Sequence, residues 1–441
     1  MAKPAVQHVP VPWHSLVKDP AGTAPATKAT LPEKTTLVGR IGMMFLSVGT
    51  GAWRVRQSMN LVADALGVVC SADVGLLTLE LTCFDDSDSF TQVYSLRTSG
   101  VNTDKLNALQ NMLVTFPEKA SSMTVEELHT MLDELDRHPA NYKAPLIGLA
   151  AAIACCGFTF LLGGGLPEMI CAFFGAGVGQ YIRHQMVHRR ISLLASIIVS
   201  VAAACLVYVG AITAAEAIFH LPAVHEAGYI CAMLFVIPGF PLITGGIDIA
   251  KLDLRSGLER MSYALLIIII ATLTGYATAY LLHFQPADFI ELQLSTALEI
   301  ILRLLCSFAG VFGFSMMFNS PPKMAAIAGC VGMIANTLRL ELIDLAGLPA
   351  GIAALLGALT AGLLASVIQK QIGFPRISIT VPSIVIMVPG LFMYRGIYLM
   401  AMTDIDDGLM WLTKAVLIVL ALPLGLVLAR ILTDNDFRHC N

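Results

Sequence analysis

The stretches VIPGFPLITGGIDIA (236–250) and SIVIMVPGLFMYRG (383–396) each hold a Pro-Gly pair inside a long apolar run. A proline in a helix interior removes one backbone hydrogen bond and clashes with the preceding turn. In lipid, that defect must be satisfied by protein or by water. Interrupted apolar segments at matching places in two halves of a chain are typical of the binding sites of membrane transporters.

The composition around these stretches is that of a membrane protein. The 441 residues are 56% hydrophobic and only 13% charged, whereas a soluble domain carries about 25% charged residues. Beyond Lys143, apolar runs of membrane-spanning length follow one another. A net charge of −4 gives no indication of nucleic-acid binding. The ten cysteines show no metal-site spacing, so the sequence indicates no cofactor and no metal.

The chain divides into a predicted tail, a small domain and a membrane part. Residues 1–34 are rich in proline and are expected to be disordered. Residues 35–142 are expected to form a cytosolic α+β domain. The membrane part is expected to consist of two five-helix halves, residues 143–290 and 291–441.

Local patterns predict the elements of the small domain. One helix is expected from Ile41 to Leu66, because apolar residues recur there at helical spacing. Residues 76–84 and 90–97 alternate like strands around an acidic turn, which predicts a hairpin. Two short helices follow, and the second begins with a capping-box pattern at Thr124.

Ten membrane spans are predicted, since about 20 apolar residues suffice for one crossing. Their approximate ranges are 145–162, 166–182, 191–215, 227–249, 258–283, 291–318, 323–343, 348–368, 377–401 and 408–430. With the N-terminus inside, every Lys and Arg of the connections falls on the inner side and acidic residues fall on the outer side. This positive-inside pattern predicts a multi-pass protein of the cytoplasmic membrane with both termini in the cytoplasm.

Five spans per half would place the two halves in opposite orientations. The Pro-Gly spans are the fourth of each half, so they would cross the membrane in opposite directions and could meet near its midplane. The sequence therefore predicts a polytopic α-helical membrane protein with about ten transmembrane helices in a 5+5 inverted repeat.

Several stretches resemble the threonine/serine exporter family, which joins a cytosolic N-terminal domain to ten membrane helices. They are GRIGMMFLSVGTGAWRVRQSMNLVADALGV (39–68), TVEELHTMLDEL (124–135), FTFLLGGG (158–165), VIPGFPLITGGIDIAKLDLRSGLER (236–260) and VPGLFMYRGIY (388–398). Taken together in this order and spacing, these stretches extend the resemblance over about residues 39–430. One departure is that Arg56 and Gln57 follow Val55 where the family usually has Val-Glu, so a role for that acidic residue does not carry over.

The residues of the two breaks are the first candidates for a substrate site. Broken helices expose backbone N–H groups, which attract a carboxylate. The alternative is that kinks only aid helix packing. This first set consists of Pro238, Gly239, Pro241, Pro389 and Gly390.

Charged and aromatic residues of the membrane part form the second set. Glu299 and Arg303 are four residues apart near the middle of the predicted sixth span, so they either line a substrate or proton path or lock two helices together. Tyr394 and Arg395 follow the second break and could be site residues or interfacial anchors. Asp248 could carry a proton or cation, or lie in a loop at the inner face.

Other polar residues of the membrane part have less specific expectations. Asn336 could be an amide partner for a substrate or a helix-packing residue. Arg339 is expected to snorkel toward the interface. Glu341 and Asp344 are expected in a solvated outer loop.

The resemblance implies a secondary transporter that exports threonine, serine and similar small amino acids, with the proton as coupling ion. No nucleotide-binding motif appears in the sequence. Export of succinate-like dicarboxylates is the alternative cargo, since one two-chain member of the family is associated with succinate export. Two alternatives belong to other functional classes. The chain could be a passive channel, or it could be a signalling or enzymatic module that acts through residues 35–142. The oligomeric state stays open, a homo-oligomer included.

Overall fold

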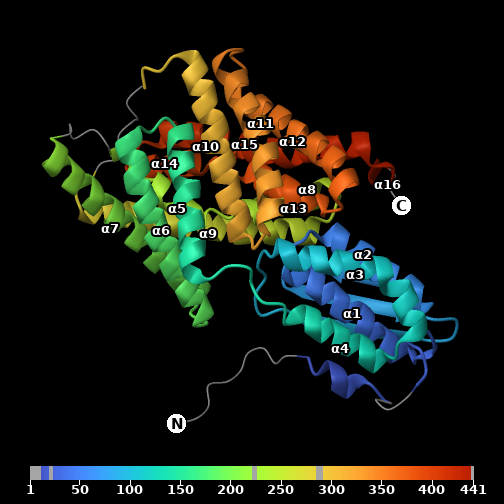
Figure 1. Ribbon diagram of the computed structural model, residues 1–441. Coiled ribbons are helices and arrows are strands. Elements are labelled where there is room, and N and C mark those ends of the chain that lie inside the picture. Colours follow the sequence, from blue (N-terminus) through green and yellow to red (C-terminus); the bar gives the residue numbers. More distant parts are fainter. Residues whose placement is uncertain (1–10, 19–22, 221–225, 285–291, 439–441) are drawn as a thin grey trace, which may run out of the picture. The chain divides into compact units, whose positions relative to one another are not determined.

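A computed structural model describes residues 11–18, 23–220, 226–284 and 292–438 (Figure 1). The chain forms two compact units. The N-terminal unit comprises Met1–Ala140 together with Lys251–Arg260, and the helical unit comprises Asn141–Ala250 and Met261–Asn441.

The N-terminal unit combines helices with a small antiparallel sheet. Its strands lie in the order β1-β2-β3, with Cys70 opposite Cys83 and Leu79 opposite Tyr94. The predicted hairpin is confirmed as β2 and β3, while β1 was not predicted. The elements are η1 (Trp13–Leu16), η2 (Ala26–Lys28), α1 (Leu31–Ser47), α2 (Ala52–Leu66), β1 (Val69–Val74), β2 (Thr78–Phe84), β3 (Ser89–Ser95), α3 (Thr103–Ser122) and α4 (Val125–Asp136).

The prediction of one helix from Ile41 to Leu66 was wrong. Helix α1 ends at Ser47 and α2 begins at Ala52. Gly49 adopts φ 86°, a left-handed conformation that glycine tolerates far better than other residues. A Cβ on Gly49 would also lie 2.6 Å from the carbonyl oxygen of Gly100. The two helices pack together into the core instead of forming one rod.

The predicted tail also contains ordered elements among its described residues. Both η1 and η2 lie within it, and α1 begins before residue 34, where the backbone N–H of Thr30 donates to Glu33 Oε2 at 3.0 Å. The η1 segment contacts α1 and α4. The rest of the predicted tail, residues 1–10 and 19–22, lies outside the described residues.

The segment Lys251–Arg260 is separated in sequence from the rest of the N-terminal unit but belongs to it. Arg255 forms ion pairs with Asp73 and Glu80. Glu259 Oε2 accepts the backbone N–H of Leu76 at 2.6 Å. Arg260, which is 1% exposed, donates to the carbonyl oxygen of Thr50 at 2.8 Å. Arg255, Glu259 and Arg260 all lie in the first two turns of α9 (Leu254–Leu281), so the start of this long helix belongs to the N-terminal unit.

The helical unit contains seven helices that are long and apolar enough to cross a membrane, among the described residues, and an eighth if α13 and α14 count as one span bent by 47°. Every predicted span range overlaps a helical segment. These segments are α5 (Ala144–Leu161), α6 (Leu166–His188), α7 (Leu193–Phe219), η3 (Glu226–Tyr229), η4 (Cys231–Val236), α8 (Gly239–Ala250), α9 (Leu254–Leu281), α10 (Thr296–Met317), α11 (Pro322–Asp344), α12 (Ala350–Ile372), α13 (Arg376–Val385), α14 (Gly390–Ala401), α15 (Ile405–Thr433) and α16 (Asn435–Arg438).

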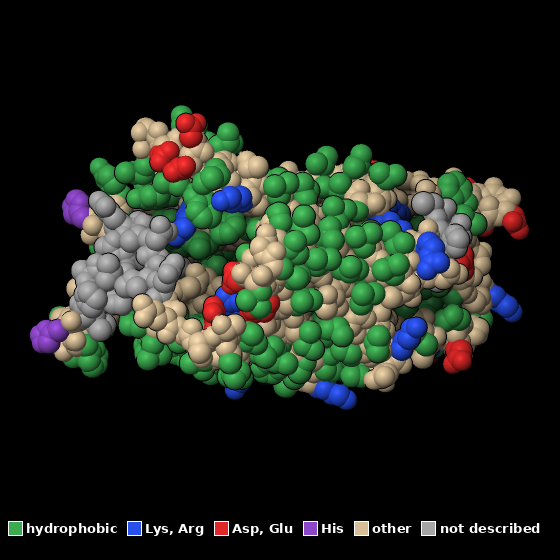
Figure 2. Space-filling view, turned by 90° about the horizontal axis from the view of Figure 1, so that it is seen from above, with side chains coloured by type: hydrophobic (Ala, Val, Ile, Leu, Met, Phe, Trp, Pro, Cys, Tyr) green, Lys and Arg blue, Asp and Glu red, His purple; other side chains and the backbone are tan. Residues whose placement is uncertain are grey.

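The helical unit buries small residues and exposes large apolar ones. Alanines such as Ala151, Ala204 and Ala358 are completely buried, whereas Leu206 and Leu417 are more than half exposed. In the face shown in Figure 2, hydrophobic side chains cover most of the surface and charged ones gather at a few places. This distribution is that of helices that pack through small residues and face lipid with large ones.

Candidate functional site

The two Pro-Gly pairs break their spans in the same way. At the first, the N–H of Ile237 donates to Leu234 O, and that of Gly239 to Ile237 O. At the second, Val388 donates to Val385 O, and Gly390 donates to Val388 O. The next helix then begins at each glycine, and each proline carbonyl accepts a bond from four residues further on. The two breaks therefore have matching backbone conformations.

The two breaks also contact each other reciprocally. A Cβ on Gly239 would lie 3.0 Å from Cγ1 of Val385 and 3.4 Å from Cγ2 of Val388. A Cβ on Gly390 would lie 2.9 Å from Cδ2 of Leu234 and 3.2 Å from Cγ1 of Ile237. Each glycine thus packs against the two residues that hold the turn of the opposite break. This exchange is the pattern that a local two-fold axis produces.

Helices α5 and α10 repeat the reciprocal arrangement beside the breaks. A Cβ on Gly157 would lie 2.7 Å from the carbonyl oxygen of Cys306, and a Cβ on Gly313 would meet the carbonyl oxygen of Ala150. Phe158 follows the first glycine and Phe314 follows the second, and their rings meet edge to face with centroids 6.3 Å apart. The close approach of these backbones requires glycine at both places.

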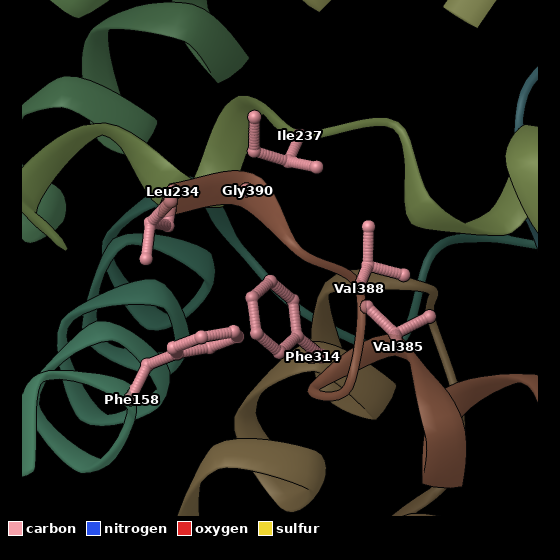
Figure 3. A pocket seen from close by; sticks show the side chains of 7 residues that line it. All are labelled: Phe158, Leu234, Ile237, Phe314, Val385, Val388 and Gly390. Atoms are coloured by element: carbon pink, nitrogen blue, oxygen red, sulfur yellow. The ribbon is translucent and has the colours of Figure 1, made fainter. Parts of the chain in front are cut away.

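A small apolar pocket lies where the breaks and these two rings meet (Figure 3). Its lining consists of Phe158, Leu234, Ile237, Phe314, Val385, Val388 and Gly390. In the close-up, the two phenylalanine rings approach each other below the turn that contains Gly390. Of the predicted site residues, only Gly390 lines this pocket.

The helix after each break packs on the long helix that lies downstream of the other break. Gly246 of α8 lies against Pro423 of α15. On the other side, a Cβ on Gly275 of α9 would lie 3.3 Å from the Tyr394 ring of α14. Tyr276 and Tyr398 form a second contact between α9 and α14, with ring centroids 5.6 Å apart. The helices on either side of the two breaks are therefore interleaved.

Tyr394 and Arg395 lie on α14, one turn beyond the second break. Tyr394 is 1% exposed, and its hydroxyl has no hydrogen-bond partner among the residues that the structure describes. Its ring stacks on that of Tyr398, with centroids 5.9 Å apart. The guanidinium of Arg395 lies over the ring of Trp411, 5.0 Å from its centroid. A buried tyrosine hydroxyl ordinarily finds a partner, which makes Tyr394 notable.

Asp248 lies near the end of α8 and is only 1% exposed. The expectation that it might lie in a loop is therefore wrong. With a rise of about 1.5 Å per residue, it is well over two helical turns from Gly239. It does not line the pocket at the breaks.

Glu299 and Arg303 belong to an ion-pair cluster that joins α10 to α11. Arg303 pairs with Glu299 at 2.6 Å, with Glu341 at 2.8 Å and with Asp344. The side chain of Arg303 is 13% exposed and that of Asp344 is 47% exposed. The cluster therefore runs from the half-buried interior to the ends of the two helices.

Two predictions about this cluster need correction. Arg303 lies about two turns from the start of α10 rather than near the middle of a span, because the helix begins at Thr296 after an N-cap at Ser295. Glu341 and Asp344 lie in the last turns of α11 rather than in a solvated loop. Their pairing with Arg303 lowers the cost of an arginine in a membrane helix, which is about 2.5–3.5 kcal/mol on insertion scales.

A second polar chain lies next to this cluster and was not predicted as a unit. Arg339 Nε donates to Asn336 Oδ1 at 3.0 Å, and Asn336 Nδ2 donates to Ser307 Oγ at 2.9 Å. Asn336 and Ser307 are completely buried, and Arg339 is half-buried. Arg339 therefore bonds through Nε to a residue one turn back in α11, and its snorkelling toward the interface stays a prediction.

The sequence contained a signal for the residues that the prediction missed. Gly-Phe-Thr at 157–159 and Gly-Phe-Ser at 313–315 fall in the first spans of the two halves. Large apolar residues also stand at matching positions before each break, at 234 and 237 and at 385 and 388. Alignment of the two halves with each other would have marked all six apolar side chains of the pocket.

Apolar helices of spanning length and paired broken helices define a polytopic membrane protein of the transporter class. Two family models match the chain. The model described as "Putative threonine/serine exporter" matches residues 36–282, and "Threonine/Serine exporter, ThrE" matches residues 303–432. The chain therefore belongs to the threonine/serine exporter family, as the resemblance indicated.

Individual relatives agree with this assignment. The chain is 24% identical over 409 residues to a probable threonine/serine exporter of Mycobacterium tuberculosis, a match that covers 90% of this chain and 75% of the relative. It is also similar to probable succinate transporter subunits YjjP. The one from Klebsiella aerogenes is 24% identical over 56% of this chain and 92% of its own length, and the one from Escherichia coli is 23% identical over 56% and 93%. No solved structure matches the chain.

Proposed function

We propose that the chain exports threonine, serine and similar small amino acids across the cytoplasmic membrane, driven by the proton gradient. The observation that carries the proposal is the reciprocal packing of the breaks at Gly239 and Gly390. Membership of the family supports the proposed cargo class. The M. tuberculosis relative, which is described as a probable threonine/serine exporter, matches 90% of this chain and 75% of its own length.

The proposed transport cycle uses the two breaks as the meeting point of two inverted five-helix halves. The matching turns and the glycine exchange between α5 and α10 support this repeat. In the cycle, one half rocks against the other, and the apolar pocket widens as the glycine contacts separate. The N–H groups of Gly239 and Gly390 donate within the turns, and Pro241 has none. The first-turn N–H groups that then become available to the substrate are those of Phe240 in α8 and of Leu391 and Phe392 in α14, because a helix start leaves such groups without an intrahelical partner.

Side chains of the candidate set take roles in this cycle. Tyr394 offers a buried hydroxyl one turn beyond Gly390 and is proposed to bond the substrate once the halves separate. Arg395 is proposed to attract anionic groups near that end of α14. Asp248 is a buried carboxyl and the proposed proton carrier. Glu299 and Arg303, with their acidic partners, are proposed to line the route between the helix ends and the breaks.

A succinate-like dicarboxylate is the second candidate cargo. The observation in its favour is the similarity to probable succinate transporter subunits, which extends over 56% of the chain. Both cargo classes carry a carboxylate, so the same helix starts could receive either one.

Counterflow in proteoliposomes tests the proposal. Purified protein is reconstituted, and uptake of labelled threonine, serine and succinate is measured against an excess of the same compound inside. Threonine and serine are expected to exchange, and an imposed pH gradient is expected to drive accumulation. Exchange of succinate alone would replace the cargo, and lack of uphill movement would indicate a channel.

Two variants test the site assignment in the same assay. Arg303→Ala and Pro389→Ala are expected to reduce export while membrane insertion stays intact. Wild-type flux through both well-inserted variants would contradict the assigned roles of these residues.

A further inference from the structure

Arg339 is an arginine inside a membrane helix that forms no direct ion pair with a carboxylate among the described residues. Its only hydrogen bond to the described part of the chain runs from Nε to Asn336 Oδ1. A guanidinium carries five N–H donors, so the two terminal nitrogens retain their capacity to donate. In a bilayer, such a group faces protein or a polar cavity and marks a functional position.

The nearby carboxylates are already engaged by a different arginine. Glu299, Glu341 and Asp344 all pair with Arg303. Arg303 therefore holds the direct contacts of these carboxylates, and the terminal nitrogens of Arg339 form no direct ion pair with the described residues. Arg303 in α10 and Arg339 in the neighbouring helix α11 therefore differ in their ion pairs.

The position of Arg339 links it to the second break. A Cβ on Gly357 would lie 3.1 Å from Arg339 Cβ and 3.3 Å from Met387 Sδ. Met387 comes two residues before Pro389, inside the turn that forms the break. Glycine at 357 thus leaves room for the arginine stem beside the turn. Movement of the break would therefore change the space around Arg339.

The partners of Arg339 are fixed in orientation. Asn336 is held from one side by Arg339 and from the other by Ser307 Oγ, at 3.0 and 2.9 Å. Both Asn336 and Ser307 are completely buried, so they have little freedom to rearrange. The result is an arginine held through Nε, which leaves the planar fork of its terminal nitrogens for a carboxylate.

We infer that Arg339, positioned by Asn336 and Ser307, binds the carboxylate of the transported substrate at the second break. This inference rests on the proposed export of small amino acids or dicarboxylates, and it names the group that both cargoes share. The site would select for a carboxylate and against the corresponding amide or alcohol, because only an anion forms the charge-assisted bidentate pair.

Equilibrium binding to the detergent-purified full chain tests the inference without relying on transport. Thermal unfolding is followed with threonine, serine, succinate and threonine amide at rising concentrations. At least one carboxylate is expected to raise the unfolding temperature of the wild type, and threonine amide is not. Arg339→Gln is expected to bind that carboxylate at least about tenfold more weakly, and Arg339→Lys to fall between the two, because lysine lacks the planar fork.

Lys370→Gln provides the matched control, since it removes one cation from the exposed end of α12. It is expected to bind as the wild type does. If Arg339→Gln does not give a monodisperse protein, Arg339→Lys and Asn336→Ala carry the comparison. Equal binding by the wild type and the Arg339 variants, or no stabilisation by any carboxylate, would overturn the inference. Failure of the proposed function has a different signature, namely intact carboxylate binding with no counterflow.

Discussion

Gly239 packs against Val385, the residue whose carbonyl oxygen begins the turn at the opposite break, and Gly390 packs against its counterpart Leu234. The first prediction follows from this exchange. Alanine at either glycine would meet its neighbour at about 3 Å, and overpacking of this kind costs about 1–3 kcal/mol. Gly239→Ala and Gly390→Ala are therefore both expected to slow counterflow, by up to about 100-fold.

Gly210 in α7 supplies the control for this pair. A Cβ at that position would have no neighbour within 4 Å, so Gly210→Ala is expected to leave transport unchanged. A defect at one break only, with normal rates at the other, would argue against equivalent roles for the two glycines.

The second prediction concerns the aromatic pair below the breaks. Phe158 and Phe314 are 6% and 3% exposed, and removal of a buried phenylalanine side chain costs about 3–5 kcal/mol. Both Phe158→Ala and Phe314→Ala should lower the unfolding temperature of the purified protein. Their effects are expected to combine less than additively, because the rings touch. Phe174→Ala, at a side chain that is 54% exposed, should change the temperature little.

The third prediction ranks the acidic partners of Arg303. Glu341 is 17% exposed and Glu299 is 39% exposed. Loss of a well-shielded charge-assisted bond costs about 1.5–3 kcal/mol, whereas an exposed pair contributes about 0–1 kcal/mol. Chemical denaturation in detergent is expected to show Glu341→Gln as the less stable variant. If Glu299→Gln were instead the less stable variant, the exposure of each carboxylate would not determine its contribution to stability.

How far the sequence predicted the fold depended on the kind of interaction involved. Each of the ten span ranges predicted from apolar runs overlaps a helical segment, since contact with lipid requires long apolar stretches. The short helix α16 was not predicted, and seven or eight helices among the described residues are long and apolar enough to span. Local turn chemistry predicted the hairpin and the capped start of α4. The division between α1 and α2 was missed because it depends on the approach of Gly100 to Gly49. A contact between residues so far apart in the chain cannot be predicted from the spacing of apolar residues.

The candidate site was predicted in part for the same reason. The two breaks were found because proline and glycine are local signals. The pocket side chains were missed because Phe158 and Val385 look like any other apolar residue until the two halves are compared. The bond of Arg339 to Asn336 was not predicted, because it depends on a side-chain rotamer that no sequence pattern specifies.

The fourth prediction concerns the pH response of the η1 segment. His14 bonds to Glu126 at 2.6 Å and to Asp133 at 3.3 Å, and these hydrogen bonds raise its pKa above the usual histidine value. Asp133 also pairs with Arg40 and Arg137. Because the folded pKa is raised, the stabilisation is complete below about pH 6.5 and is lost as the pH rises through the folded pKa.

Loss of the His14 contacts is expected to release the η1 segment, and limited proteolysis at Lys18 measures this release. Cleavage by trypsin is expected to accelerate above neutral pH by more than the change in enzyme activity, which an exposed peptide calibrates. His14→Gln should remove the additional acceleration. An unchanged ratio between wild type and variant across the pH range would show that His14 does not hold the segment.

The fifth prediction tests the orientation of the halves. In a variant without native cysteines, single cysteines replace Ser192, between α6 and α7, and Asp404, between α14 and α15. The charge pattern places the first inside and the second outside. A membrane-impermeant maleimide should label only the second in intact cells and both after permeabilisation. Labelling of both in intact cells would contradict the inverted arrangement.

The segment Lys251–Arg260 has a consequence for where such a protein can be divided. It joins α8 to α9, yet its charged side chains complete the N-terminal unit, where Arg260 is 1% exposed. A cut between Ala140 and the first membrane helix would separate the N-terminal unit from its segment Lys251–Arg260 and from the bonds that this segment forms. A cut after α9 would leave every one of these bonds intact. The first family model runs from residue 36 to residue 282, past the end of α9, so it keeps the segment Lys251–Arg260 in one piece with most of the N-terminal unit.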